Sequence, residues 1–327
     1  MIALSGGVGG AKLALGLTHS LKPDQLMVVV NTGDDFEHLG LTICPDLDTL
    51  LYTLAGVANP QQGWGLRGES WAVLDQLRRL GGEDWFQLGD LDIATHLLRG
   101  QWLREGLSLS QVTARLGERF GLSCRIVPMS DDPVRTMVRC ETGELGFQEY
   151  FVRERCAPRV SGFRFAGVET ARPQADWMRA LADPALEAVL ICPSNPFVSV
   201  GPMLALPGVR EQLARSAAPV VAVSPIVGGQ ALKGPAAKMM EELGLAATAL
   251  GVARHYQGVI DALAIDSQDA DQAPAIEALG IRALVTGTVM KTLPDRIRLG
   301  QELLDFSRQL RAASPRPRGL SGVSGTE

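Results

Sequence analysis

Residues 2–12, Ile-Ala-Leu-Ser-Gly-Gly-Val-Gly-Gly-Ala-Lys, decide the fold, because a short apolar run opens there into four glycines within five positions. Glycine has no Cβ, so an anion can approach the backbone N–H groups. The helix expected over residues 11–21 points its positive dipole end at the same place. A second apolar run, 26–30, ends in polar residues 31–35. Together these segments predict a βαβ unit with polar groups where a ribose is usually bound. The candidate contacts in this unit are Gly7, Val8, Gly9, Gly10, Lys12, Asn31 and Asp34.

The glycine segment does not fully match either common phosphate-binding motif. Lys12 does not directly follow a glycine and no Ser or Thr follows it, which excludes a Walker A motif. A dinucleotide fingerprint that begins at Gly7 would need a glycine where Lys12 stands. The alternative is a tight strand-to-helix turn without a ligand. Lys12 is then either a phosphate contact or a solvated surface charge.

The composition is that of a globular protein. The chain has 327 residues, of which 46% are hydrophobic and 20% are charged, so it can bury a full core. A formal net charge of -5 argues against nucleic-acid binding. No apolar run reaches about 18 residues, and no basic leader precedes the first strand, so we expect a cytoplasmic protein with no membrane partner. The five cysteines never form a C-x-x-C pair, which predicts reduced, packed thiols.

The order of apolar patterns predicts an α/β fold. We expect a Rossmann-like three-layer sandwich with a mainly parallel sheet, plus a helical insertion and a small antiparallel β segment. Residues 1–49 and 188–310 would form the nucleotide-binding core. Residues 50–187 would be an insertion, helical to about residue 122 and then β hairpins, including a strand over 145–152. Residues 311–327 are rich in Ser, Pro, Arg and Gly and would form a flexible tail.

Two pairs of aspartates with D-x-D spacing lie before expected helices. Asp46 and Asp48 stand at or just before a helix start, and Asp90 and Asp92 follow Gly89. On an extended loop such a pair can bind one hard cation, and Mg²⁺ favours one or two carboxylates together with phosphate oxygens and water. As helix caps, the same residues would need no ligand. Both interpretations remain open from the residues alone.

Later strands also end in small polar residues. Ser194 and Asn195 follow the run 188–192, and Ser224 follows the run 219–223. In an open parallel sheet these ends share one edge, where such folds bind ligands. The loop 128–133, which contains Ser130 and Asp131, either serves a ligand or only turns the chain.

Two side chains have a structural interpretation beside a functional one. Trp64, in a glycine-rich segment, either forms the wall of a pocket for a planar ring or packs in the core or on the surface. His96 stands on an apolar face with no partner nearby in the sequence, and we interpret it as a structural histidine rather than a base.

Seven segments stand in an order that resembles the CofD family of phospholactyl transferases in coenzyme F-420 biosynthesis, across nearly all of residues 1–310. They are 5–12, 31–35, 44–49, 88–90 with 94–96, 128–133, 193–196 with 199–202, and 223–226 with 234–236. The resemblance implies transfer of a phospholactyl, enolpyruvyl-phosphate or phosphoglyceryl group from a guanosine-diphosphate-activated donor to the ribityl hydroxyl of the deazaflavin Fo. GMP would be released with Mg²⁺ present, and the chain would form a homodimer.

The resemblance also implies roles for individual residues. Asp48 matches the aspartate that contacts Fo, and Asp46 would share the metal with it. Gln87 stands where relatives often carry a basic residue. The hydroxyl of Fo would attack the phosphorus in line with departing GMP while Asp48 orients or deprotonates it. The backbone of residues 7–10 and the 194–195 loop would hold the guanosine diphosphate part. The other expected contacts are Asp90, Ser130, Asp131 and Ser224.

Two other classes of protein are weighed against this transferase. The first is a CofD-like regulator that binds a nucleotide sugar without turnover. Segments 44–49 and 128–133 favour the transferase over it. The second is a nicotinamide dehydrogenase, which the missing glycine at position 12 disfavours.

Overall fold

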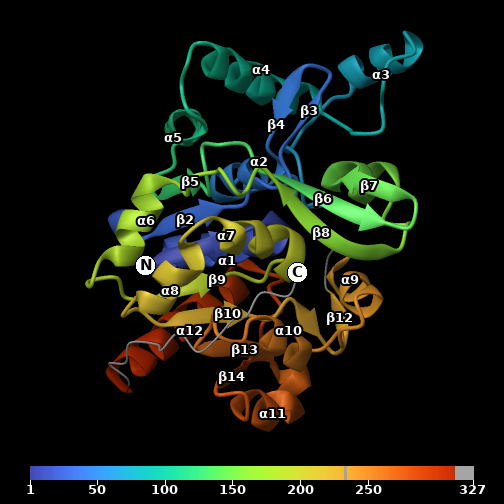
Figure 1. Ribbon diagram of the computed structural model, residues 1–327. Helices are drawn as coiled ribbons and strands as arrows, with labels where there is room; N and C mark the ends of the chain where they lie inside the picture. Colours follow the sequence, from blue (N-terminus) through green and yellow to red (C-terminus); the bar gives the residue numbers. More distant parts are fainter. Residues whose placement is uncertain (232–233, 314–327) are drawn as a thin grey trace.

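The computed structural model describes residues 1–231 and 234–313, and its centre is a seven-stranded sheet in which all strands are parallel (Figure 1). The order across the sheet is β14-β13-β10-β9-β1-β2-β5. The strands are β1 (Ile2–Ser5), β2 (Met27–Val30), β5 (Arg125–Pro128), β9 (Val189–Ile191), β10 (Val220–Val223), β13 (Ala262–Asp266) and β14 (Arg282–Thr286).

Helices cover both faces of this sheet because successive residues of each buried strand point to opposite sides. Ala3 of β1 packs in the core on one face, and its neighbour Leu4 packs in the core on the other. The first face carries α1 (Gly7–Ser20), α2 (Pro45–Leu54), α5 (Leu109–Arg119) and α12 (Leu293–Ala313). The second carries α6 (Ala175–Ala182), α7 (Gly201–Ala205), α8 (Val209–Arg215), α9 (Ala236–Glu242), α10 (Ala249–His255) and α11 (Ala273–Glu277). The predicted three-layer α/β fold is confirmed.

Smaller elements extend from one side of the sheet. Figure 1 shows α3 and α4 beside the β3–β4 hairpin at the top of the view, with the β7-β6-β8 sheet below them. These elements are α3 (Ala72–Arg79), α4 (Asp90–Arg104), β3 (Phe36–His38), β4 (Leu41–Ile43), β6 (Arg135–Cys140), β7 (Gly143–Gly146) and β8 (Val160–Ala166). A short hairpin, β11 (Ile226–Val227) with β12 (Gln230–Ala231), follows β10. The remaining turns are η1 (Pro23–Gln25), η2 (Glu149–Arg153), η3 (Pro196–Val200) and η4 (Ser267–Gln272).

The strand expected over residues 145–152 is wrong, because the chain leaves β7 at Gly146 and forms the π-helix η2. Phe147, Tyr150 and Phe151 recur at helical rather than alternating spacing. Tyr150 is fully buried, and the rings of Phe147 and Phe151 stack with centroids 5.5 Å apart.

The boundaries of the expected insertion also differ. Strand β5 pairs with β2 in the main sheet, so the segment 50–187 contributes one strand to the core. Helix α12 continues through residues 311–313, and the rest of the expected tail, 314–327, lies outside the described residues. Within the described part of the chain, no helix is both long and apolar enough to span a bilayer.

The glycine-rich segment is the first turn of α1 rather than a loop before it. The helix begins at Gly7, not at residue 11, and Gly7 has a φ of +65°. A Cβ at Gly9 would overlap the carbonyl oxygen of Pro193, and one at Gly10 would overlap the hydroxyl of Ser5. These two glycines therefore allow α1 to pack closely on strand ends. At Gly7 the nearest atom to an added Cβ would be Asp46 Oδ1 at 3.7 Å.

We predict that Gly9→Ala destabilises the protein by about 2 kcal/mol or more, because the added Cβ meets rigid backbone. Gly117→Ala is the matched control, since Gly117 lies inside α5 and its added Cβ would have its nearest neighbour at 4.0 Å. That control should be neutral or stabilise by up to about 1 kcal/mol. Urea unfolding measures both, and equal midpoints for the two variants would contradict the packing role of Gly9.

Candidate active site

A cavity of about 790 Å³ lies at the end of the sheet where the carboxyl ends of β1, β9 and β10 meet. This is within the usual size of ligand pockets, roughly 300–1,000 Å³. Its lining is of two kinds. The polar part includes eleven of the sixteen site residues that the sequence predicts: Gly7, Val8, Gly9, Lys12, Asp34, Asp46, Asp48, Gln87, Ser194, Asn195 and Ser224. The apolar part includes Ile43, Trp64, Trp85, Phe86, Phe147, Phe151 and Val152.

The polar part begins at the N-terminus of α1. The Ser194 hydroxyl accepts a hydrogen bond from the N–H of Gly6 at 3.2 Å and donates to the Gly6 carbonyl at 2.8 Å. The N–H of Gly7 donates to Asp46 Oδ1 at 2.7 Å. The carboxylate of Asp46 thus occupies the position at the helix N-terminus where an anion binds. A phosphate that enters this place meets a negative charge as well as a helix dipole.

Asp46 belongs to a pair of buried carboxylates joined by one amide. Asn31 Nδ2 donates to Asp34 Oδ1 at 2.7 Å and to Asp46 Oδ2 at 3.0 Å. Burial, and then the negative charge of Asp46, raises the pKa of Asp34 well above its ordinary range. Burial also raises the pKa of Asp46 to about 6, although the hydrogen bonds from Asn31 and Gly7 lower it. This pair carries more negative charge than its surroundings neutralise.

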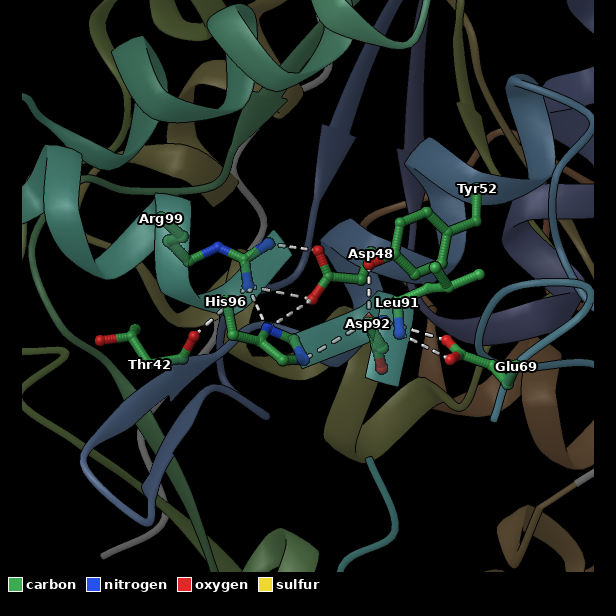
Figure 2. A network of polar contacts seen from close by, with 8 residues as sticks. All are labelled: Thr42, Asp48, Tyr52, Glu69, Leu91, Asp92, His96 and Arg99. Atoms are coloured by element: carbon green, nitrogen blue, oxygen red, sulfur yellow. Dashed lines mark hydrogen bonds and ion pairs between the residues drawn. The ribbon is translucent and has the colours of Figure 1, made fainter. Parts of the chain in front are cut away.

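Asp48, two residues further along the first turn of α2, has a different environment (Figure 2). Both of its carboxylate oxygens accept hydrogen bonds from the guanidinium of Arg99, which comes from α4 and is 1% exposed. His96 Nδ1 lies 3.8 Å from Asp48 Oδ2. Asp46 and Asp48 were expected at or just before a helix start, and Pro45 begins that helix. Both aspartates therefore lie in the first turn of α2, and their carboxylates meet different partners.

Five predicted contacts do not line the cavity. Asn31 and Gly10 lie just behind it, where they support Asp46 and the packing of α1. The Asp90 carboxylate accepts hydrogen bonds from the Ser70 hydroxyl at 2.6 Å and from the N–H groups at the start of α3. These bonds lower the pKa of Asp90, which acts as a cap rather than as a ligand group.

The loop 128–133 turns the chain rather than reaching the cavity. Asp131 accepts a hydrogen bond from the N–H of Ser110 at 2.6 Å, near the start of α5. The hydroxyl of Ser130 donates to the carbonyl of Arg172 at 2.7 Å and accepts from the N–H of Asp132 at 3.0 Å. The alternative interpretation of this loop, a turn, therefore fits its contacts.

The sequence interpretation gave no role to Tyr52 or Arg99, and it treated Asp92 and His96 separately, as part of a D-x-D pair and as a structural histidine. Asp92, His96 and Arg99 recur at i, i+4 and i+7, which puts them on one face of α4. Tyr52 stands one turn after Asp48 on α2 and also lines the cavity. This helical spacing of polar residues was a signal in the sequence. Their meeting with Asp48 depends on how α4 packs against the core.

The described residues contain one group of three side chains with metal-ligating atoms within 4.8 Å of one another, namely Asp48, Asp92 and His96. Arg99 already supplies a positive charge to this group through Asp48. A second cation there would face the buried guanidinium, so the group is suited to hold Arg99 rather than a metal ion.

The fold and the site define an α/β protein that binds ligands at the carboxyl ends of its strands, in a cavity with both carboxylates and aromatic rings. A family model described as "2-phospho-L-lactate transferase CofD" matches residues 1–279. The chain belongs to the CofD family and is a CofD-type transferase, which confirms the predicted class of enzyme.

Curated relatives match over nearly their whole length. A "Phosphoenolpyruvate transferase" of Kitasatospora aureofaciens is 41% identical over 322 residues, with 96% of this chain and 99% of that protein covered. A "2-phospho-L-lactate transferase" of Methanosarcina acetivorans is 40% identical over 296 residues, with 89% and 93% covered. Among solved structures, a UPF0052 family protein from Bacillus halodurans aligns with a TM-score of 0.60 at 15% identity over 93% of this chain and 97% of that one, which supports the fold alone.

We predict that the ligand-free protein becomes less stable as the pH rises from about 4 to about 7. The folded pKa of Asp46, about 6, lies above its ordinary value of 3.8, so in this range the folded state binds more protons than the unfolded state. Asp46→Asn should remove part of this dependence, on the order of 2 kcal/mol across the window. Urea unfolding at several pH values measures it. An unchanged slope in the variant would contradict the assignment.

Proposed function

We propose that this enzyme transfers a three-carbon phospho-acid group from a guanosine-diphosphate-activated donor to the ribityl hydroxyl of the deazaflavin Fo, releasing GMP, in coenzyme F-420 biosynthesis. The observation that carries the proposal is the double lining of one cavity. One part has a helix N-terminus that can bind a diphosphate and carboxylates that can hold its metal ion. The other part has aromatic side chains against which a planar ring can pack. Relatives about 40% identical over nearly their full length are named as transferases of such groups, which supports the same reaction.

The two substrates would use different parts of the lining. The diphosphate would lie near Gly7, Lys12 and Ser194, where backbone N–H groups and one lysine face the cavity. The deazaflavin ring would pack against side chains such as Trp64 and Trp85. The edge-to-face contact between His38 and Trp85, with ring centroids 5.2 Å apart, braces this aromatic wall from the β3–β4 hairpin.

Magnesium fits the chemistry of this site. The carboxylates of Asp34 and Asp46 are buried, face the cavity and keep raised pKa values, so bringing a diphosphate beside them requires a compensating cation. We propose that Asp34 and Asp46 hold Mg²⁺. This differs from the expected pair of Asp46 and Asp48, since Arg99 already neutralises Asp48. The bound ion would supply charge neutralisation on the phosphate oxygens.

The chain's own groups would act mainly by positioning. Transfer of a substituted phosphoryl group needs little covalent chemistry from the protein, so alignment of the attacking hydroxyl is the main task. Asp48 is paired with Arg99 and lines the cavity, so its remaining lone pairs can accept a hydrogen bond from the ribityl hydroxyl of Fo. Apolar side chains around the ring would limit competing attack by water.

The choice among phospholactate, phosphoenolpyruvate and phosphoglycerate, the homodimer and the cytoplasmic location remain predictions. Gln87 lines the cavity and carries no charge, so any contact of Gln87 with Fo would be a hydrogen bond. Parallel assays with each of the three activated acids decide the choice of acid.

We predict that Asp48→Asn lowers the rate of transfer by about 100-fold. An amide has only one acceptor oxygen, so it cannot both keep two hydrogen bonds with Arg99 and accept a hydrogen bond from the attacking hydroxyl as well as a carboxylate does. The assay contains Fo, Mg²⁺ and a guanylylated acid and follows GMP and the heavier deazaflavin by mass spectrometry. Asp305→Asn, on the exposed surface of α12, is the control and should keep full activity. Full turnover by Asp48→Asn would show that Asp48 has no role in transfer.

We predict that Asp34→Asn and Asp46→Asn each weaken divalent metal binding at least 10-fold, because each removes one of two adjacent carboxylates. Binding of Mn²⁺ as a probe for Mg²⁺, in the presence of GDP, measures the effect by electron paramagnetic resonance. Asp48→Asn serves as the comparison and should weaken binding much less. The reverse ranking would favour the original pair, Asp46 with Asp48.

A further inference from the structure

The guanidinium of Arg99 is buried behind Asp48, and its two terminal nitrogens both donate hydrogen bonds. Nη1 donates to Asp48 Oδ2 at 3.1 Å, to His96 Nδ1 at 2.9 Å and to the carbonyl of Thr42 at 3.3 Å, while Nη2 donates to Asp48 Oδ1. Arg99 does not line the cavity, whereas Asp48 and His96 do. The arginine therefore holds the carboxylate from the protein side and leaves its other side open to a ligand.

This arrangement determines the tautomer of His96. A guanidinium only donates hydrogen bonds, so His96 Nδ1 must accept and cannot carry a proton. The ring proton is then on Nε2, which lies 3.4 Å from Asp92 Oδ1 (Figure 2). His96 is 1% exposed, so solvent does not compete for either nitrogen. In this form the imidazole presents an acceptor to Arg99 and a donor to Asp92.

Asp92 is in turn fixed from two sides. The hydroxyl of Tyr52 donates to Asp92 Oδ1 at 2.6 Å. Glu69 accepts hydrogen bonds from the N–H groups of Leu91 and Asp92 at 2.8 and 3.0 Å, which closes the N-terminus of α4. Burial alone would raise the pKa of Asp92, but its polar contacts with His96 and Tyr52 keep the pKa below its ordinary value.

We propose that Arg99 and His96 are positioning residues for the transfer reaction, which hold the carboxylate of Asp48 in the one orientation that aligns the attacking hydroxyl. The inference rests on the proposed role of Asp48 in binding the acceptor hydroxyl. The planar guanidinium of Arg99 donates hydrogen bonds to both oxygens of Asp48, which a lysine cannot reproduce. His96 Nδ1 accepts a further hydrogen bond from Arg99 and thereby fixes the orientation of the guanidinium.

The chemistry of the cluster argues for such a role rather than for packing alone. A buried ion pair is seldom the most stabilising way to join two helices, because well-packed apolar side chains do this at lower cost in desolvation. Here Asp48 of α2 and His96 of α4 line the ligand cavity, and Arg99 of α4 holds Asp48 from behind. Supporting hydrogen bonds of this kind fix the geometry of reacting groups.

The test compares four variants in the transfer assay. Arg99→Lys keeps the charge but loses the paired hydrogen bonds of the guanidinium to Asp48. We expect its kcat to fall about 100-fold, while the affinity for GDP stays within about twofold. His96→Gln retains an acceptor and a donor and should keep most of the activity, whereas His96→Leu should lose about as much as Arg99→Lys. Arg308→Lys, on the exposed surface of α12, is the control and should match the wild type.

A second measurement does not depend on activity. Nitrogen-15 spectra of the full-length protein labelled in its four histidines should show His96 as the neutral Nε2–H form, and Arg99→Lys should alter that signal. An Nδ1–H form would overturn the inference, as would equal activity of His96→Leu and His96→Gln. Absence of transfer by the wild type would instead reject the proposed function, while the spectra would still decide the arrangement of Arg99 and His96.

Discussion

The close approach of α1 to the end of β9 is the constraint on which the rest of the site depends. Gly9 lies directly against the carbonyl of Pro193, and Ser194 bonds both backbone groups of Gly6. Any side chain at position 9 would move the helix start away from the sheet. With the helix in place, the N–H of Gly7 reaches Asp46. The main role of the glycines is thus to set the distance between the N-terminus of α1 and the carboxylates, and their effect on the approach of a ligand is secondary.

The first turn of α2 then separates two carboxylates that are two residues apart. Asp46 turns toward α1 and shares Asn31 with Asp34, so this side of the turn keeps excess negative charge and raised pKa values. Asp48 turns toward α4 and is neutralised by Arg99. One helical turn therefore provides a carboxylate suited to a cation and another suited to a fixed hydrogen bond. Residues two apart in a helix point about 200° away from each other, which is enough to direct Asp46 and Asp48 to different neighbours.

Local patterns allowed the core to be predicted from the sequence. Each buried strand of the main sheet is a short apolar run followed by glycine or small polar residues, and a parallel sheet must bring those ends together, so Asp34, Ser194 and Ser224 were found to line one cavity. Patterns failed where the same residues have two local solutions. The segment 7–10 fits either a loop or a tightly packed helix turn, and the close approach of Gly9 to Pro193, 184 residues further along the chain, distinguishes the two.

The partner of Asp48 could not be predicted for a different reason. Arg99 is 51 residues from Asp48, and nothing in the local pattern of α4 says which element its polar face will meet. The spacing of Asp92, His96 and Arg99 indicates one face, but the fold alone determines that this face packs against α2. The cavity is therefore assembled from two parts, because α2 provides the carboxylate and α4 provides the groups that hold it. Since the contacts of the Asp48 carboxylate come from α4, the packing of α4 against α2 helps to set the shape and charge of the cavity.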